Sequence, residues 1–587
     1  MDQKRLLLAI AISVAILLGF QLMLPTPKPV PAPIAGAPAA PTPDTGTPTA
    51  PAAAGTAAPA PIAPASAKAV PRDVPRLPIA APRLEGSISL LGARLDDLVL
   101  KGYRETVQPG SPLVRLLEPR SEKQPYYIQV GWSADDGVTA KLPDSDTLWT
   151  GSGVAGPGTT ALLRWDNGAG LVFEIEVGVD ADYMFTLRQR VRNTTGASVA
   201  LHPWARIRRD YKPHTAGYYI LHEGMLGVLD GRLKETTYDH AKSEGEKKGG
   251  VALEQTGPGG WIGFTDKYWL TALVPAQASV QTAAFRHISE AGSDRYQVDF
   301  VAKDAVAVPP GGMAETVTHA FAGAKEVHVL DRYESAYQVP SFDKAVDFGW
   351  FYFITKPFFY ALDWLFGITG NFGIAILIFT LFIKGLFFPL ANKSYRSMSK
   401  MKLLAPKMTA LREQYKEEPQ KLQQAMMEMY KTEKVNPASG CLPIVIQIPV
   451  FFSLYKVIFT TIEMRHAPFF GWIRDLSAVD PTNVFTLFGL LPYDPAMLPM
   501  FGHFLHLGAW PLVMGFTMWA QMRLNPPPPD PIQAKIFAWM PVLFTFMLAS
   551  FPAGLVIYWA WNNTLTIGQQ WLIMRQTKLD KPQAARV

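Results

Sequence analysis

The chain has 587 residues and a formal net charge of +6, and 48% of its residues are hydrophobic while 18% are charged. This length allows more than one domain, and the composition favours a mixture of soluble and membrane-embedded parts over a single globule. The single cysteine, Cys441, excludes an intrachain disulfide and cysteine-based metal clusters, and the patterns GxxxxGKS/T, HExxH and GxSxG are absent, which leaves no nucleotide, zinc or serine-hydrolase motif.

The first two segments cannot form a folded core. Residues 1–24 carry Asp2, Lys4 and Arg5, followed by an almost uninterrupted apolar run. Because this run is longer than a typical signal-peptide core and no small-x-small cleavage site follows it, we expect an uncleaved transmembrane anchor, with a cleaved signal peptide as the alternative. Residues 25–70 are rich in proline and alanine, which predicts an extended tether.

Residues 71–340 alternate apolar and polar residues in short runs, such as LVFEIEVGV at 171–179, separated by turn-forming pairs. This pattern predicts a large antiparallel β domain, most simply a two-sheet sandwich. The histidines of this region show no metal-binding spacing, and Glu174 and Glu176 alternate along a strand without a visible partner. We therefore interpret them as ordinary surface residues rather than catalytic groups.

Residues 343–367 are strongly aromatic and could be mistaken for a membrane span. Asp347, Lys356 and Asp363 recur at about two-turn intervals, which places the polar groups on one face of a helix. This one-sided pattern predicts an amphipathic helix that lies in the membrane interface instead of crossing the bilayer.

The predicted span at residues 371–391 is long and apolar enough to cross a bilayer, yet it contains Lys384. An ammonium group in the middle of such a helix costs roughly 3 kcal/mol on insertion scales. Two interpretations are open. Either the side chain reaches the headgroups by snorkelling, or it faces a wet cavity inside a helical bundle.

Residues 392–437 contain many more lysines and arginines than glutamates, which predicts a cytoplasmic location. The pattern indicates a hairpin of two helices, residues 393–416 and 420–434, with a proline at the start of the second. Its methionines either hold the hairpin together or form an adaptable surface for varied apolar segments. They include Met398, Met401, Met408, Met426 and Met427.

Four further spans are predicted at residues 441–464, 503–522, 536–551 and 554–573, followed by a tail at 574–587. With a cytoplasmic hairpin, this gives six transmembrane helices, cytoplasmic termini and an external β domain. The span 536–551 is short for a hydrocarbon core of about 30 Å, so local thinning of the bilayer is expected.

Polar side chains accumulate in these spans, but no aspartate or glutamate lies deep enough in any of them to pair with Lys384. A buried ammonium group without a partner is unfavourable, so this distribution favours a hydrated cavity over snorkelling. The polar residues are Thr380, Lys384, Gln447, Ser453, Thr517, Gln521, Tyr558, Asn562, Asn563 and Thr564.

Several stretches in the second half of the chain are distinctive. They are DFGW at 347–350, GNFGIAILIFTLFIKGLFFPLANKSYRSMSKMKLLAPKM at 370–408, EKVNPASGCLPIVIQIPVF at 433–451 and FPAGLVIYW at 551–559. Together they resemble the YidC family of membrane protein insertases, and the order of anchor, tether, β domain, interfacial helix and five-helix core resembles its Gram-negative members. The resemblance covers essentially the whole chain and is most specific over residues 346–574.

The resemblance implies that the five spans between residues 371 and 573 enclose a groove open to the cytoplasm and to lipid. The functional positive charge of the family falls on Lys384, where many members have arginine, so the charge is kept while the bidentate fork is lost. Groove positions fall on Thr380 and on Trp559, where others carry tyrosine, and we add Gln447 and Tyr558. The β domain would be a periplasmic supersandwich like that of sugar mutarotases.

The implied function is the insertion and folding of newly made proteins in the bacterial inner membrane, alone or with the Sec translocon. Implied partners are nascent membrane proteins, the Sec translocon, ribosomes or targeting factors, and lipids, with no nucleic acid substrate. No covalent chemistry is needed, so we expect neither an enzyme nor a cofactor or metal.

Two other classes of protein remain as alternatives. A small-solute transporter would also place polar groups in its spans, but it typically shows internal repeats, which are not seen here. A membrane-anchored sugar enzyme would place acid and base carboxylates in residues 71–340.

Overall fold

The computed structural model describes residues 73–135, 138, 140–215, 221–290, 292–416, 418–433, 442–491, 506–525 and 531–579. The predicted anchor at residues 1–24 and the predicted tether at 25–70 lie outside these ranges. So do residues 434–441 and 492–505, which hold the ends of two predicted spans, and residues 580–587 of the predicted tail.

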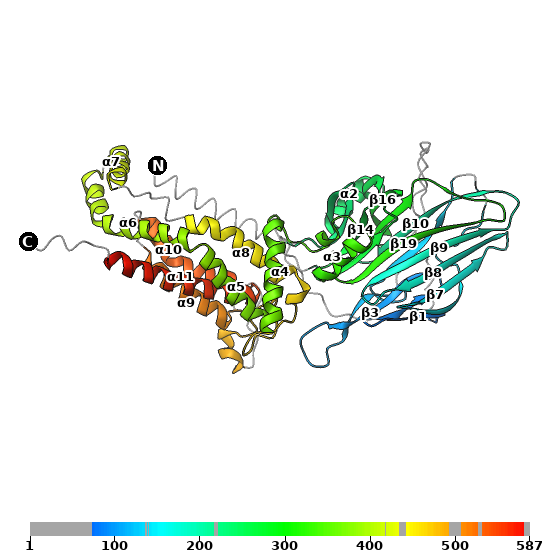
Figure 1. Ribbon diagram of the computed structural model, residues 1–587, viewed down its shortest axis with the longest axis horizontal. Coiled ribbons are helices and arrows are strands. Elements are labelled where there is room, and N and C mark those ends of the chain that lie inside the picture. Colours follow the sequence, from blue (N-terminus) through cyan, green and yellow to red (C-terminus); the bar gives the residue numbers. More distant parts are fainter. Residues whose placement is uncertain are drawn as a thin grey trace, which may run out of the picture. The chain divides into compact units, whose positions relative to one another are not determined.

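Nineteen strands occupy the first part of the described residues (Figure 1), which confirms the prediction of a large, mostly antiparallel β domain. The first run of paired strands is β13 (Val251–Pro258), β16 (Val280–Glu290), β17 (Ser293–Ala302), β10 (Val199–Arg209), β5 (Tyr126–Ser133), β3 (Arg94–Arg104), β2 (Leu84–Ser89) and β1 (Arg76–Ala80), with β4 (Leu113–Leu117) also beside β3 and β18 (Val306–Val308) also beside β10.

The second run is also antiparallel and meets the first through one parallel contact between β1 and β6. Its order is β12 (Arg232–Thr237), β11 (Gly224–Leu229), β14 (Trp261–Thr265), β15 (Trp269–Val274), β19 (Met313–Ala324), β9 (Met184–Asn193), β8 (Leu171–Val179), β7 (Thr159–Asp166) and β6 (Thr150–Gly156).

The two runs share one hydrophobic core, as the alternation along the strands requires. On β8, Phe173, Ile175 and Val177 are buried while the glutamates between them are only half-buried. Tyr126 of β5 meets Phe264 of β14 edge to face, with ring centroids 6.0 Å apart. Such aromatic pairs bury large apolar areas, so the contact stabilises the packing of one run on the other.

The sequence showed no partner for Glu174 or Glu176, and in the structure both face arginines on the neighbouring strands. Glu176 lies 3.0 Å from Arg190 of β9, and Glu174 lies 3.9 Å from Arg164 of β7. The pairing could not be read from the strand itself because it depends on the register between strands.

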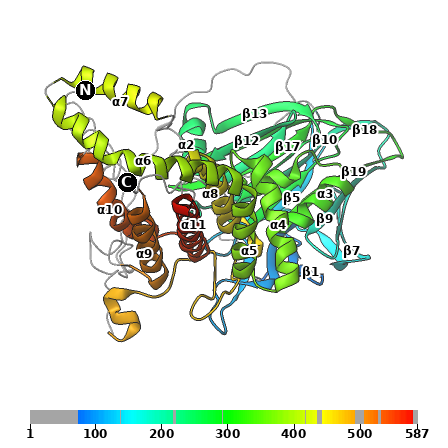
Figure 2. The same ribbon diagram turned by 60° about the vertical axis from the view of Figure 1, so that its left-hand side comes forward.

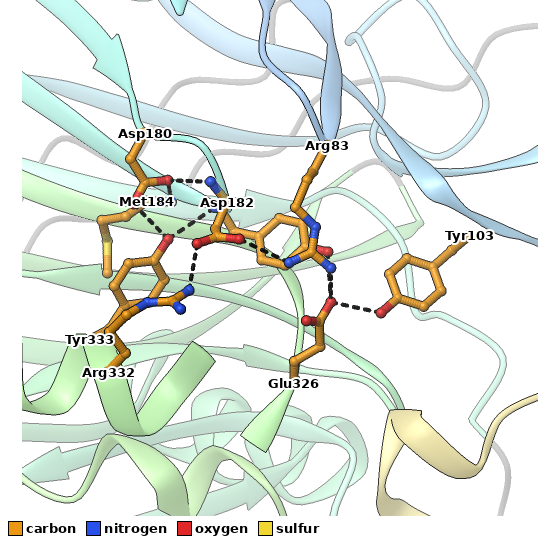
Figure 3. Close-up of polar contacts among 9 residues, drawn as sticks. Arg83, Tyr103, Asp180, Asp182, Met184, Glu326, Arg332 and Tyr333 are labelled. Atoms are coloured by element: carbon orange, nitrogen blue, oxygen red, sulfur yellow. Dashed lines mark hydrogen bonds and ion pairs between the residues drawn. The ribbon is translucent and has the colours of Figure 1, made fainter. Parts of the chain in front are cut away.

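A network of charges fixes the helix α3 (Val327–Ala336) to the end of the β domain (Figure 3). Glu326, which precedes α3, accepts hydrogen bonds from the Tyr103 hydroxyl at 2.7 Å and from Arg83. The Tyr333 hydroxyl donates to Asp180 at 2.7 Å, and Arg332 pairs with Asp182 in the β8–β9 turn. α3 is therefore anchored at both of its ends. A further helix, α2 (Tyr238–Lys247), contacts β13 and β16.

The later part of the chain is helical (Figure 2). Its helices are α4 (Tyr352–Thr369), α5 (Phe372–Leu386), α6 (Phe388–Gln414), α7 (Pro419–Thr432), α8 (Leu442–Thr460), α9 (Ala509–Leu524), α10 (Pro531–Leu548) and α11 (Ala553–Leu579). α11 contacts α5, α6, α8 and α9. By length and composition, no single described helix is long and apolar enough to cross a bilayer. α5 and residues 388–398 of α6 meet at a bend of 67°, and the two together reach that length and apolar content.

The segment 371–391 was predicted as one helix but is divided at Phe387. α5 begins at an Asn371 cap, whose side chain accepts the Ile374 N–H at 3.1 Å, and ends at Leu386. Pro389 lies in the first turn of α6, where it has no N–H to continue the ladder and its ring would clash with the preceding turn. The proline therefore accounts for the bend.

The aromatic helix α4 has two different faces. Trp350, just before it, is 97% exposed, and Phe353 and Trp364 on the helix are also exposed. Beside this exposed face, the Lys356 ammonium pairs with Asp331 at 2.9 Å and with Asp343. The polar face predicted from the sequence is therefore occupied by charges of α3 and of the turn that follows it.

Candidate functional site

Lys384 and Thr380 lie one turn apart on α5, and α11 supplies the partner of the lysine. The Lys384 ammonium donates to the Thr566 hydroxyl at 2.8 Å. Thr380 is buried, and its hydroxyl donates to the Ile376 carbonyl at 2.6 Å, so its hydrogen-bonding is satisfied within the helix. Among the described residues, no carboxylate lies within ion-pair distance of Lys384.

Thr566 was not among the residues predicted from the sequence. It belongs to a polar stripe on α11 with Asn562 and Gln570, and the spacing of four places these residues on adjacent turns of one helix face. The Thr566 hydroxyl donates in turn to the Asn562 carbonyl at 2.7 Å. The four-residue spacing was the signal that could have identified Thr566 from the sequence.

Some buried polar atoms of the helical region lack a partner among the described residues. They include the side-chain oxygens of Asn562 on α11 and Ser453 on α8. Buried polar groups are almost always hydrogen-bonded to protein or to water. A helical bundle that leaves such atoms open therefore provides sites for water or for polar groups of a bound chain.

A second polar pair lies two turns before Thr566 on α11. The Gln447 amide of α8 donates to the Tyr558 hydroxyl at 2.6 Å. A separation of eight residues corresponds to about 12 Å along a helix. The Trp559 ring packs between two phenylalanines, with ring centroids 4.6 Å from Phe451 and 6.0 Å from Phe544.

The predicted methionines lie on α6 and α7. Met426 and Met427 line a pocket of about 240 Å³ on α7 together with Leu422, Gln423 and Tyr430. The Tyr430 hydroxyl of α7 donates a hydrogen bond to the Met408 sulfur of α6 at 3.7 Å, so this methionine helps to hold the two helices together. Met398 and Met401 are half-buried on α6. The hairpin thus shows both uses of methionine, internal packing and an open apolar surface.

The chemistry of these residues is that of binding. One ammonium with a neutral partner can attract an anionic group, and neutral hydroxyl and amide groups can replace water around a polar chain. Within the described ranges, no group of three or more His, Cys, Asp or Glu side chains could hold a metal ion.

A β domain joined to an apolar helical bundle, which carries polar pairs and a lysine hydrogen-bonded to a neutral hydroxyl, fits a membrane-associated protein. Comparisons with known proteins identify the family. Residues 76–361 match the family described as the YidC periplasmic domain, and residues 364–581 match the family described as 60Kd inner membrane protein.

Two relatives share most of the length of the chain, and both carry the name membrane protein insertase YidC. The protein from Granulibacter bethesdensis is 58% identical over 526 residues, which cover 89% of this chain and 90% of the relative. The protein from Acidiphilium cryptum is 52% identical over 520 residues, which cover 87% and 86%. The chain therefore belongs to the YidC family of membrane protein insertases, and the resemblance found in the sequence is confirmed.

A solved structure described as an active YidC insertase with the first transmembrane domain resolved also matches. It covers 85% of this chain and 93% of its own, at 16% sequence identity and a TM-score of 0.33. A likeness this distant supports no argument about the site.

Proposed function

We propose that this protein inserts newly made integral membrane proteins into the inner membrane and assists their folding, alone or with the Sec translocon and ribosomes or targeting factors. Its length-wide relationship to proteins named membrane protein insertase supports the activity. The partners beyond the nascent chain rest on the family resemblance.

The proposed topology has six transmembrane helices, with both termini in the cytoplasm and the β domain in the periplasm. The basic hairpin of α6 and α7 lies on the cytoplasmic side, because lysines and arginines are retained there. α4 lies in the interface, with its exposed aromatic face toward lipid and its charged face toward α3.

The environment of Lys384 is the main support for the proposed mechanism. Its ammonium lies among apolar helices and is held by a neutral hydroxyl of Thr566 at 2.8 Å. In the proposed groove, water and the polar groups of α8 and α11 lower the cost of bringing a polar tail into the membrane, and Lys384 attracts the acidic groups of that tail. The substrate helix then leaves sideways into lipid, where its apolar surface is buried.

The hairpin would provide the first contact with a substrate. Met426 and Met427 line an open apolar pocket of about 240 Å³, which can adapt to different apolar segments. The membrane potential adds an outward force on an acidic tail of about 2.3 kcal/mol per charge per 100 mV.

Substitutions at Lys384 test this mechanism. Lys384→Arg keeps the charge and should support normal insertion, whereas Lys384→Met and Lys384→Glu should impair substrates with acidic tails and spare those with neutral tails. Insertion is measured by protease protection of each tail in cells depleted of the native protein.

Thr566→Val serves as a matched variant, because it removes the hydroxyl contact but keeps the charge. It should slow insertion less than Lys384→Glu does. Equal insertion of acidic-tailed substrates by the wild type and by a stably accumulated Lys384→Glu variant would exclude the charge mechanism. Failure of depletion to affect any membrane protein would exclude the insertase function itself.

A further inference from the structure

The connection between α8 and α9 contains a short segment that exposes apolar side chains. In the 3-10 segment Val484–Gly489 and the two residues after it, Leu487 is 52% exposed, Phe488 57% and Leu490 82%. Residues 481–502 include a single charged residue, Asp494. Scattered apolar residues are common on surfaces, but a contiguous group of this kind marks a contact surface.

The backbone of this segment aims two adjacent large side chains away from the fold. Leu487 (φ 48°, ψ 47°) and Phe488 (φ 59°, ψ 32°) both adopt the left-handed conformation, which is unfavourable for residues with bulky side chains. Asn483 fixes this shape, because its carbonyl accepts the Phe488 N–H at 2.9 Å. Its side-chain oxygen accepts the Phe485 N–H at 3.0 Å.

Most N–H groups of the segment have acceptors within the protein. The acceptors are Leu507 O for Val484, Asn483 Oδ1 for Phe485, Asn483 O for Thr486 and Phe488, Thr486 Oγ1 for Gly489, Leu487 O for Leu490 and Thr486 O for Leu491. Turns in water often have internal acceptors as well, but in a hydrocarbon environment each unsatisfied backbone group costs several kcal/mol.

The segment is tied to the start of α9. The Val484 N–H donates to the Leu507 carbonyl at 2.9 Å, and Asp480 accepts the Trp510 N–H at 2.9 Å in the first turn of that helix. Asp480 also accepts the indole N–H of Trp472 at 3.1 Å, and the Trp472 ring is itself partly exposed. Indole rings with one polar edge are enriched at the membrane surface.

We propose that residues 487–491 insert into the acyl-chain region of the leaflet in which α8 and α9 end, and so hold the connection between these two helices at a fixed depth. The exposed apolar side chains, the lack of charge at residues 487–491 and the N–H groups that mostly have internal acceptors fit lipid chains as the occupant. This lipid contact is separate from the proposed insertase function. The two proposals share only the assumption that α8 and α9 span the membrane.

A fluorescent probe tests the depth of the segment. A single cysteine is placed at Leu490 in a Cys441→Ser background, labelled with an environment-sensitive dye and reconstituted in phosphatidylcholine–phosphatidylglycerol vesicles. The probe should emit at shorter wavelength than in water and be quenched several-fold more by lipids brominated on the acyl chains than by aqueous iodide. A second probe at Leu487 should behave in the same way.

The control is a probe at Val107, an exposed apolar residue in the turn between β3 and β4, which iodide should quench and brominated lipids should not. Strong iodide quenching at both Leu490 and Leu487 would overturn the proposal. Protection from iodide without quenching by brominated lipids would also overturn it and would indicate a second copy of the chain. Protection that appears only when a substrate is added would assign the surface to substrate instead. Insertion activity measured on the same vesicles keeps a failed lipid contact separate from a failed insertase function.

Discussion

Two lysines in this protein are hydrogen-bonded to threonine hydroxyls, and their surroundings give them different roles. Lys325 donates to Thr265 at 2.9 Å inside the β domain, where Asp266 and Asp347 contribute opposing charge. Lys384 donates to Thr566 at 2.8 Å, and within the described residues it has no carboxylate at ion-pair distance. A lysine surrounded by fixed carboxylates is structural, whereas one with a neutral partner remains available to an anionic ligand.

The burial of Lys325 is expected to make the stability of the protein depend on pH. Burial lowers the pKa of Lys325 from 10.5 to about 8. Between these two values the unfolded chain binds a proton that the folded chain does not, so the stability contributed by this site rises as pH increases from about 8 to 10.5. Lys325→Met should abolish this rise, as measured by thermal unfolding in detergent at pH values from 7.5 to 10.

Lys303→Met provides the control for that series, because Lys303 is an exposed lysine of the same domain. This variant should keep the pH dependence of the wild type. An unchanged pH dependence in Lys325→Met would show that Lys325 does not carry the linkage.

Among the helices, α4 has a polar face that the sequence predicted, but the partners of that face were not predicted. The sequence predicted one polar face from Asp347, Lys356 and Asp363, and the last two do share a face of α4, whereas Asp347 lies before the helix and pairs with Lys456 at 2.8 Å. Lys356 pairs with Asp331 and Asp343, and Asp363 lies 2.9 Å from His328. Periodicity identifies a face, but its partners come from other elements and depend on the fold.

The pair of Lys356 and Asp343 supports a prediction about how α4 is held. The Asp343 carboxyl is 5% exposed and the Lys356 side chain 19%, so Lys356→Met leaves a buried carboxylate without its cation. Removing one partner of such a pair costs about 3 kcal/mol. We expect a lower thermal unfolding temperature and faster amide hydrogen exchange in α3 and α4.

The double variant Lys356→Met/Asp343→Asn removes both charges and should recover much of the lost stability, because no buried charge is left unpaired. A double variant as unstable as the single one would show that packing, and not the ion pair, is what Lys356 supplies.

The sequence was sufficient for features that repeat along one element. Alternation identified the β domain, and apolar runs identified most of the helices. It was insufficient where two distant elements meet. The bend at Phe387 was missed because Pro389 was read as part of a continuous apolar span, although its position alone predicts a break. The contact from Lys384 to Thr566 joins residues on α5 and α11, and no periodicity within one helix reports it.

In the molecule as a whole, α3 contacts both the β domain, which precedes it in the chain, and the helical region, which follows it. Tyr333 and Arg332 contact the β8–β9 turn, while Asp331 pairs with Lys356 of α4 at 2.9 Å. The Val327 N–H at its first turn is accepted by the Glu463 carboxylate just after α8 at 2.9 Å. α3 is therefore part of the support of the helical region as much as of the β domain.

This double role predicts different results for two deletions. Removing residues 71–325 keeps α3 and so keeps the partners of Glu463 and Lys356, and insertion of simple substrates should remain largely intact. Removing residues 71–336 also deletes α3, which leaves the buried Glu463 carboxyl without its Val327 donor and removes Asp331, one of the two carboxylate partners of Lys356. This longer deletion should accumulate poorly and lose most insertion, as measured by immunoblotting of membranes and by protease protection of a substrate tail.

A point variant separates loss of these contacts from loss of chain length. In the shorter deletion, Asp331→Asn removes the charge that faces Lys356 but leaves every residue of α3 in place, so it should lower accumulation part of the way toward the longer deletion. Asp304→Asn in the full chain serves as a matched change at an exposed carboxylate and should have no effect. If both deletions insert substrates equally well and accumulate to the same level, α3 does not support the helical region. If the shorter deletion accumulates normally but inserts nothing, the β domain itself takes part in insertion.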